Sequence, residues 1–348
     1  MNRSTAPDGQ VLSVLGPQLK ELERRLREDL GAGGPFLRKE GLRLLESGGK
    51  RLRPSMAIAA GHLGAYDASR VLPVAAAIEM IHMATLVHDD VIDGAPLRRG
   101  AATTFALHGA HTAVYTGDWM LVKALRALSA LDDALSGRDV RSPAPGGRRA
   151  TVPETLVEGL EALCAGEVDQ YLGRGRLPSV KTYLSRIERK TAALFAAACA
   201  AGAAAVDLDD SVVRTCAEFG RAYGIAFQIA DDLLDVGGIA AGPAGKPVAH
   251  DLVQGIATLP YLLAAKASPD YRARLEYHFR EVGTPGAPAR PERVLALTHE
   301  MTALGGVEAA HRVALRHLDE AEERLATLPP SVGRDMLAEL SRLPLAAR

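Results

Sequence analysis

An all-α fold is predicted by the residue composition, by the spacing of the apolar residues and by the placement of the helix breakers. Apolar residues make up 47% of the 348-residue chain and aromatic residues only 4%, and alanine and leucine, two strong helix formers, dominate. Apolar residues recur every three to four positions along most of the chain, which places them on one face of a helix. Clusters of Gly and Pro separate these runs and mark where helices end.

The helix breakers divide the chain into a leader, a series of helices and the loops between them. Residues 1–16 contain Pro, Gly and Ser and are expected to form a flexible leader, followed by a single domain over residues 17–348. Loops are expected at 136–149 and 240–250, and a Pro-rich break at 284–291. Helices are expected at about 17–30, 35–46, 49–63, 69–93, 115–135, 153–171, 180–206 and 210–236, with more from about 258 onward.

Charge and cysteine content exclude several classes of function. The formal net charge is -1, so no excess of positive charge favours nucleic-acid binding. The three cysteines, Cys164, Cys199 and Cys216, lack metal-ligand spacing and are expected to be reduced and buried. The chain shows no signal-peptide pattern and no uncharged run of membrane length, so we expect a cytoplasmic protein that is not integral to a membrane.

Two acidic motifs carry the strongest chemical signal. Each reads Asp-Asp-x-x-Asp at the end of an apolar run, and residues four apart share one face of a helix. Two such helices facing each other would aim both carboxylate sets across one gap, which is unfavourable unless cations fill it. Carboxylate oxygens suit Mg2+, which also takes ligands from substrate phosphates, so we expect a site for Mg2+ and diphosphate. The first motif is Asp89, Asp90 and Asp93, and the second is Asp231, Asp232 and Asp235.

Basic residues stand close to the first motif. Lys50 and Arg53 lie on a Gly-preceded turn and can hold an anion, although a basic surface turn has the same composition. Arg98 and Arg99 follow the motif and can either reach the same diphosphate or pair with its aspartates. His82, two helical turns before the motif, is either a diphosphate contact or an ordinary core residue.

Two lysines can also contact the diphosphate. Lys190 stands beside the hydroxyl of Thr191 at the entry of an Ala-rich helix, where it can face the diphosphate or mark an exposed helix end. Lys246 lies on the Gly- and Pro-rich loop after the motif, where it can cap a phosphate.

Together these motifs resemble the trans-isoprenyl diphosphate synthases, also called polyprenyl synthetases. The resemblance covers about residues 35–330, and residues 81–93 are similar to the catalytic component of two-subunit heptaprenyl diphosphate synthases. It implies an isoprenoid synthase-type helical bundle around a central cavity, usually as a homodimer, and it leaves open a small regulatory partner subunit. Its anchors are residues 48–54, 89–93 with 98–100, 115–118, 189–191 and 228–235 with 245–247.

The resemblance also implies a reaction and a role for each motif residue. The reaction is head-to-tail (1'-4) condensation of isopentenyl diphosphate with an allylic prenyl diphosphate, with about three Mg2+ ions once diphosphate is bound. Asp89, Asp93 and Asp231 would ligate the metal ions, with Asp90, Asp232 and Asp235 in close support. Arg98, Lys190 and Lys246 would hold the allylic diphosphate, and Lys50, Arg53, His82 and Arg99 would hold isopentenyl diphosphate. Gln228 and Thr191 would line the reacting centre.

Product length is predicted by the residues one helical turn below the first motif. In the family, bulky aromatic residues there block the growing prenyl tail, whereas Ala84 and Thr85 are small and leave it room. Ile81, one turn deeper, can narrow the path. We therefore expect a long-chain product, roughly C30 to C40.

Three alternatives stay open, and one residue departs from the family pattern. The alternatives are a shorter-chain, geranylgeranyl-type synthase, a class I terpene cyclase on the same fold, and a non-catalytic partner subunit. The complete basic and acidic motifs favour the synthase, as does the scarcity of aromatic residues that would stabilise cyclase cations. Ile256 stands where many members have a lysine, which removes one cation near the allylic diphosphate.

Overall fold

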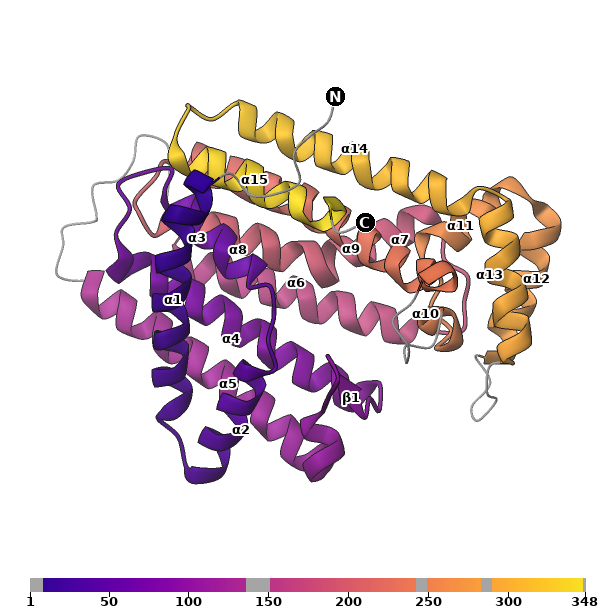
Figure 1. Cartoon of the computed structure of the whole chain (residues 1–348), viewed down its shortest axis with the longest axis horizontal. Coiled ribbons are helices and arrows are strands. Elements are labelled where there is room, and N and C mark those ends of the chain that lie inside the picture. Colours follow the sequence, from indigo (N-terminus) through magenta and orange to yellow (C-terminus); the bar gives the residue numbers. More distant parts are fainter. Residues whose placement is uncertain (1–8, 136–150, 242–248, 283–289, 347–348) are drawn as a thin grey trace. The chain divides into compact units, whose positions relative to one another are not determined.

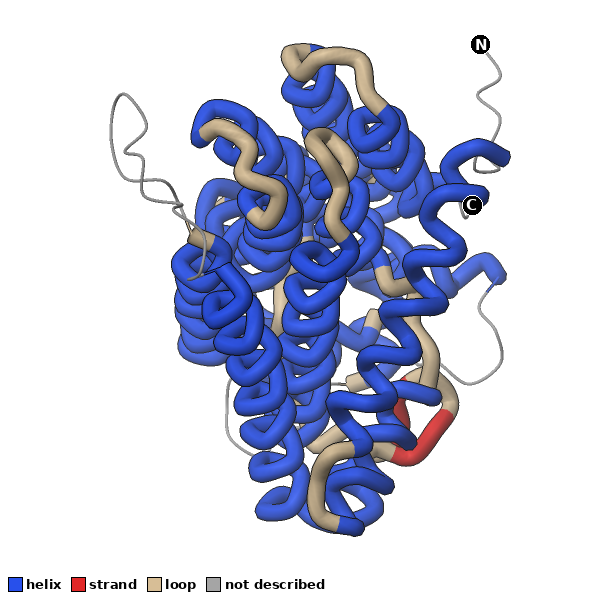
Figure 2. The backbone as a smooth tube through the Cα atoms, turned by 90° about the vertical axis from the view of Figure 1, so that its left-hand side faces the viewer, coloured by secondary structure: helices blue, strands red, loops and turns tan. Residues whose placement is uncertain are grey.

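The computed structural model describes residues 9–135, 151–241, 249–282 and 290–346, and these form the all-α fold that the sequence predicts (Figures 1 and 2). The strands within them are β1 (Leu97–Arg98) and β2 (Ala101–Ala102), a short antiparallel hairpin. A π-helical turn, η1 (Glu188–Ala192), joins α7 to α8. The helices are α1 (Gly9–Gly31), α2 (Pro35–Glu46), α3 (Leu52–Gly61), α4 (Ala68–Ile92), α5 (Thr104–Leu135), α6 (Val152–Leu172), α7 (Val180–Ile187), α8 (Ala193–Ala204), α9 (Asp210–Ala241), α10 (His250–Val253), α11 (Leu259–Ala267), α12 (Pro269–Val282), α13 (Pro291–Ala303), α14 (Gly306–Ala326) and α15 (Val332–Ala346).

The described residues group into two compact units. The first unit takes its residues from 1–157, 197–217 and 327–342, and it contains the first acidic motif. The second takes its residues from 158–196, 218–326 and 343–348, and it contains the second acidic motif.

Helix α4 forms the core of the first unit and ends in the first acidic motif. The Asp67 carboxylate accepts a hydrogen bond from the Ser69 backbone N–H and caps the start of α4. The helix packs against α5, α3 and α1, and most of its residues are buried. It stops at Gly94, whose positive φ of 60° favours a residue without a Cβ.

Within the described residues, α4 is also the helix long and apolar enough to cross a membrane. Burial inside the fold covers 78% of its most apolar window. A buried helix of this kind fits a core element of the first unit.

The second unit is built around α11. This helix packs against α12, α13, α14 and α7, and Tyr261, Tyr271 and Phe279 are fully buried in the same apolar cluster. Ile229 and Leu233 of α9 belong to this cluster as well. They lie on the turns of α9 that hold the second acidic motif, so the core fixes the helix on which that motif stands.

Three helix boundaries differ from the sequence prediction. Helix α1 begins at Gly9 rather than at residue 17, because its apolar stripe continues back to the buried Leu15. Helix α5 begins at Thr104 and contains a kink at Gly109, whose φ is 79°. Helix α9 runs through Gly237 to Ala241, so the glycine pair at 237–238 does not end it.

One expectation about the cysteines is wrong. Cys199 and Cys216 are buried thiols, but Cys164 is exposed on α6. Position 164 lies in a helix with apolar side chains on its outer surface as well, so apolar neighbours in sequence did not indicate burial there.

Candidate active site

The first acidic motif contains two kinds of carboxylate. Asp90 is 3% exposed, and its Oδ1 accepts a hydrogen bond from Arg98 Nε at 2.7 Å. Burial, partly offset by the charge of Arg98, raises the pKa of Asp90. Asp89 is half-buried and Asp93 is exposed at the end of α4. Of the two readings of Arg98, the structure therefore shows the one in which it pairs with an aspartate.

His88 anchors the start of this motif to α5. Its Nε2 lies 3.2 Å from the Val114 carbonyl oxygen and 3.4 Å from Asp118 Oδ1. A Cβ added to Gly117 would lie only 2.3 Å from His88 Nε2. The ring therefore needs a glycine beneath it, and this contact fixes the turn that leads into Asp89.

The basic cluster of the first unit consists of Arg51, Arg53, His82, Arg98 and Arg99. A Cβ on Gly49, whose φ is 151°, would lie 3.0 Å from Arg99 Nη1 and 3.1 Å from Arg51 Nη1, so both guanidinium groups rest on this glycine. Arg99 also donates a hydrogen bond to the Gly48 carbonyl. Lys50 is exposed on the same turn.

Arg51 and His82 show how this cluster is stabilised. Arg51 pairs with Glu79 at 2.6 Å and with Glu23 at 2.8 Å, so its charge is compensated within the fold. Arg53 Nη1 lies 3.2 Å from His82 Nε2. Burial, and then the positive charges of Arg53, Arg99, Arg98 and Arg51, lower the pKa of His82 well below its usual range. A neutral His82 accepts the Arg53 hydrogen bond with Nε2, which leaves Nδ1 as a donor.

The second acidic motif likewise contains both buried and exposed carboxylates. Asp232 is 5% exposed, and its two oxygens accept hydrogen bonds from Tyr183 at 2.5 Å and from Gln228 at 2.8 Å. Asp235 accepts from the backbone N–H groups of His250 and Asp251 at 3.2 and 3.3 Å, which ties α9 to α10. Asp231 is exposed.

The charges of this motif meet a fourth carboxylate, Asp251. Burial, and then the charges of Asp232, Asp235 and Asp231, raise the pKa of Asp251 well above its usual range. Burial also raises the pKa of Asp232 to about 7. Both shifts report a concentration of negative charge that a bound cation would relieve.

The sequence analysis singled out further residues besides this second motif. Lys190 Nζ pairs with Glu167 Oε2 at 2.9 Å, and Thr191 Oγ1 donates to Gln228 Oε1 at 2.7 Å. Ile256 is buried, at 7% exposed. Lys246 lies outside the described residues.

The predicted chain-length residues differ in exposure. Ala84 is fully buried and Ile81 is 5% exposed. Thr85 is half-buried, and its hydroxyl donates to the His82 carbonyl oxygen at 2.8 Å. The Thr85 side chain is thus the most accessible of the three.

Sequence reasoning missed Tyr183, Glu167 and Asp251. Tyr183 and Glu167 lie in helical runs far in sequence from the groups they bind, so no local pattern marks them. Asp251 follows the second motif by 16 positions, and an aspartate after a Gly-rich loop is a signal that could have been used.

The donor set fits Mg2+. Among the described residues, no three His, Cys, Asp or Glu side chains gather into a group that could hold a metal ion alone. Each motif instead offers two carboxylates one helical turn apart, Asp89 with Asp93 and Asp231 with Asp235. Mg2+ is commonly held by one or two carboxylates, with waters and substrate phosphates completing the shell.

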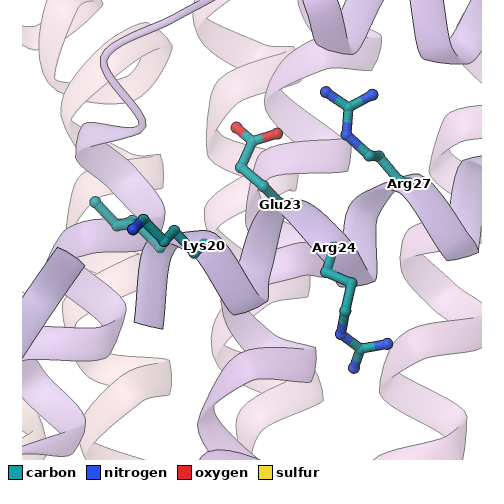
Figure 3. A pocket seen from close by; sticks show the side chains of 5 residues that line it. Lys20, Glu23, Arg24 and Arg27 are labelled. Carbon is teal, nitrogen blue, oxygen red and sulfur yellow. The ribbon is translucent and has the colours of Figure 1, made fainter. Parts of the chain in front are cut away.

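A surface hollow on α1 is separate from these groups. It is lined by Leu19, Lys20, Glu23, Arg24 and Arg27, and Figure 3 shows their side chains spread along that helix. Arg24 pairs there with Glu21 and Glu28 of the same helix. The hollow contains none of the acidic-motif residues, so we assign it no role in the site.

Comparison with known proteins gives consistent results. The polyprenyl synthetase family profile matches residues 35–288. Heptaprenyl diphosphate synthase component 2 of Bacillus subtilis is 35% identical over 331 residues, which are 95% of this chain and 88% of that protein. The crystal structure of heptaprenyl diphosphate synthase from Staphylococcus aureus superposes with a TM-score of 0.83 at 30% identity, covering 96% of this chain and 98% of that one.

A second solved structure is similar over nearly the full length. Polyprenyl synthase from Caulobacter crescentus, complexed with calcium and isoprenyl diphosphate, has a TM-score of 0.84 at 29% identity and covers 99% of both chains. Further relatives are named as synthases of both shorter and longer prenyl products.

The fold and the paired acidic motifs define an isoprenoid synthase-type enzyme. The chain belongs to the polyprenyl synthetase family, and it is a prenyltransferase.

Proposed function

We propose that this enzyme joins isopentenyl diphosphate head-to-tail (1'-4) to an allylic prenyl diphosphate, with Mg2+ as cofactor, to give a long-chain all-trans polyprenyl diphosphate. The basic cluster carries this proposal. Four guanidinium groups and a neutral histidine gather in the unit that also holds the first acidic motif. A second anionic substrate needs such a cluster, whereas a cyclase with one substrate does not.

Each set of residues has a defined task in this reaction. Lys50, Arg53, His82 and Arg99 bind the diphosphate of isopentenyl diphosphate, and Lys190 binds that of the allylic substrate. Asp89 and Asp93 of the first motif, and Asp231 and Asp235 of the second, would hold Mg2+, which when bound would supply positive charge that stabilises diphosphate as a leaving group. The C1–O bond of the allylic substrate breaks, C4 of the isopentenyl group bonds to that C1, and the proton released from isopentenyl C2 passes to the departing diphosphate.

We also propose a homodimer formed through α5. Four large apolar side chains on one face of this helix are exposed by 39–60%: Val114, Tyr115, Val122 and Leu125. Large apolar side chains that gather on the exposed face of a helix are typical of a protein interface, and here they surround the exposed Asp118. We propose that a second copy of this chain occupies this face. We also propose that the enzyme is located in the cytoplasm.

Assembly with a separate partner subunit is the alternative to a homodimer. Relatives from Bacillus subtilis and Geobacillus stearothermophilus are named as component 2 of a heptaprenyl diphosphate synthase, which supports a partner chain for this enzyme as well.

The test is incubation of the purified chain with Mg2+, isopentenyl diphosphate and farnesyl diphosphate, followed by sizing of the dephosphorylated prenyl alcohols. A ladder ending at one long chain length is the expected result. Unchanged farnesyl diphosphate would point to a missing partner subunit. A hydrocarbon formed without isopentenyl diphosphate would overturn the proposal in favour of a cyclase.

A further inference from the structure

A continuous chain of hydrogen bonds links the helical run 180–204 to the second acidic motif. Tyr183 donates to one oxygen of Asp232 at 2.5 Å, and Gln228 Nε2 donates to the other at 2.8 Å. Thr191 Oγ1 donates to Gln228 Oε1 at 2.7 Å. The Gln228 amide nitrogen faces Asp232 and its oxygen faces Thr191. Each group in the chain is therefore held in one orientation.

Three of the four residues in this hydrogen-bond chain are buried, and Gln228 is half-buried. Tyr183, Asp232 and Thr191 are 1%, 5% and 6% exposed. Arg186, itself 7% exposed, lies over the Tyr183 ring at 5.8 Å and brings a positive charge to Asp232. Buried polar groups lose water on folding, so each of these bonds is costly to break.

The π turn η1 places Tyr183 and Thr191 on the same side of their helical run. Tyr183 and Thr191 are eight residues apart, which in an uninterrupted α-helix would separate them by about 80° around the axis. A π turn has more residues per turn and rotates each by less, so it returns Thr191 toward the face of Tyr183.

Two glycines of the facing helices make room for this wider turn. A Cβ on Gly166 of α6 would lie 2.5 Å from the Lys190 backbone nitrogen. A Cβ on Gly224 of α9 would lie 2.5 Å from Ala192 Cα. The turn therefore packs closely on both sides, and Lys190 is carried on a rigid segment.

We propose that Tyr183 is a positioning residue for prenyl transfer. Together with Thr191 it clamps Asp232 and Gln228, and so fixes Lys190 of η1 relative to Asp231 and Asp235 of α9. Asp232 has a structural role as a hydrogen-bond acceptor within the protein and is not a metal ligand. This inference rests on the proposed function, because prenyl transfer is its first readout.

The experiment compares Tyr183→Phe with Tyr271→Phe in the full-length enzyme. Tyr271 is fully buried in the same unit and donates to the Leu297 carbonyl oxygen at 3.1 Å, so both variants lose one buried tyrosine hydrogen bond. With Mg2+, farnesyl diphosphate and isopentenyl diphosphate, we expect Tyr183→Phe to lower kcat by about tenfold or more while KM for isopentenyl diphosphate stays unchanged. Equal kcat values in the two variants would overturn the proposal.

Thr191 supplies a second test that does not depend on the folding of Tyr183→Phe. Thr191→Val removes the hydroxyl that binds Gln228 and is expected to speed amide exchange in residues 228–235, whereas Thr191→Ser keeps the hydroxyl and should leave that exchange at the wild-type rate. In the double variant with Tyr183→Phe and Thr191→Val, the combined increase in exchange should be smaller than the product of the two single increases, because both act on the same two side chains. Strictly multiplicative increases, or wild-type exchange in Thr191→Val, would contradict the clamp.

Hydrogen exchange separates this inference from the proposed function. Tyr183→Phe should speed amide exchange in residues 228–235, and Tyr271→Phe should not, whether or not the wild-type enzyme transfers prenyl groups. Unchanged exchange in residues 228–235 would overturn the clamp alone, and a wild-type enzyme without transfer would overturn the proposed function alone.

Discussion

Arg98 Nε lies 2.7 Å from Asp90 Oδ1, and this pair separates Asp90 from the other two carboxylates of the first acidic motif. Asp90 is 3% exposed, whereas Asp93 is exposed at the end of α4. Asp89 and Asp93 share one face of the helix, and Asp90 lies about 100° around from Asp89. The motif therefore combines one structural carboxylate with two that suit a metal ion.

This division predicts different losses for Asp90→Asn and Asp93→Asn. Removing the Asp90 charge leaves Arg98 without its buried partner, so we expect the free energy of unfolding to fall by about 1–3 kcal/mol. The Mg2+ concentration for half-maximal activity should stay nearly constant. Asp93→Asn should raise that concentration at least about tenfold, because a proposed Mg2+ ligand is lost. Thermal unfolding and Mg2+ titrations measure the two effects, and an equal Mg2+ shift in both variants would contradict the division.

Gly117→Ala should disturb the first motif through His88. The added Cβ would lie 2.3 Å from His88 Nε2, so the ring must move, at a cost of about 1–3 kcal/mol in the free energy of unfolding. Because His88 directly precedes Asp89, kcat should fall as well. Chemical denaturation and steady-state kinetics measure both quantities.

Two variants control this prediction. Gly237→Ala lies inside α9 with no atom within 4 Å of its Cβ, so it should stabilise the enzyme by about 0.5–1 kcal/mol. In a His88→Ala background the destabilisation by Gly117→Ala should largely disappear. A persistent full effect there would show that the ring contact is not the cause.

The basic cluster predicts an acid-sensitive stability. The folded-state pKa of His82 lies well below its unfolded value of 6.5, so the unfolded chain binds the extra proton as pH falls. The contribution of His82 to stability should therefore be constant above about pH 6.5 and decrease below it, by at most about 1.4 kcal/mol per pH unit, whereas the raised pKa of Asp232 acts in the opposite direction. His82→Gln keeps a hydrogen-bond acceptor for Arg53 and does not titrate, so its stability relative to the wild type should rise between pH 6.5 and 5. Denaturant unfolding at each pH measures this, and His299→Gln, at an exposed histidine, should leave the wild-type dependence intact.

The helices and both motifs could be predicted from sequence because their signals are local. The apolar period and the Gly94 stop place the first motif at the end of α4, as observed. The choice between the two readings of Arg98 could not be made, because either reading satisfies a pattern of charges in sequence. Tyr183 could not be identified at all, since its partner Asp232 is 49 residues away and the π turn that brings Thr191 to the face of Tyr183 has no sequence period.

The exposed face of α5 predicts that a single charge there will prevent the proposed dimer from forming. Val122→Glu would bury a carboxylate in an apolar interface, at a cost of several kcal/mol. We expect the variant to be monomeric in sedimentation or light-scattering measurements while its helix content is unchanged. Leu295→Glu introduces the same charge at a residue 47% exposed on α13 and should stay dimeric. A wild-type enzyme that is already monomeric, or a dimeric Val122→Glu, would exclude α5 as the interface.

A substitution at Thr85 is the clearest test of what determines the length of the product. Ala84 is fully buried, so Ala84→Phe overpacks the core and would confuse a folding defect with a change in specificity. Thr85 is half-buried, and an aromatic ring there can extend from the surface of α4 toward the path of the growing tail. Thr85→Phe should shift the prenyl alcohols to shorter chains, and Thr85→Val, nearly equal to threonine in size, should leave their lengths unchanged. If Thr85→Phe folds normally and makes the wild-type product, the tail does not pass this residue, and the small side chain at 85 does not account for a long product.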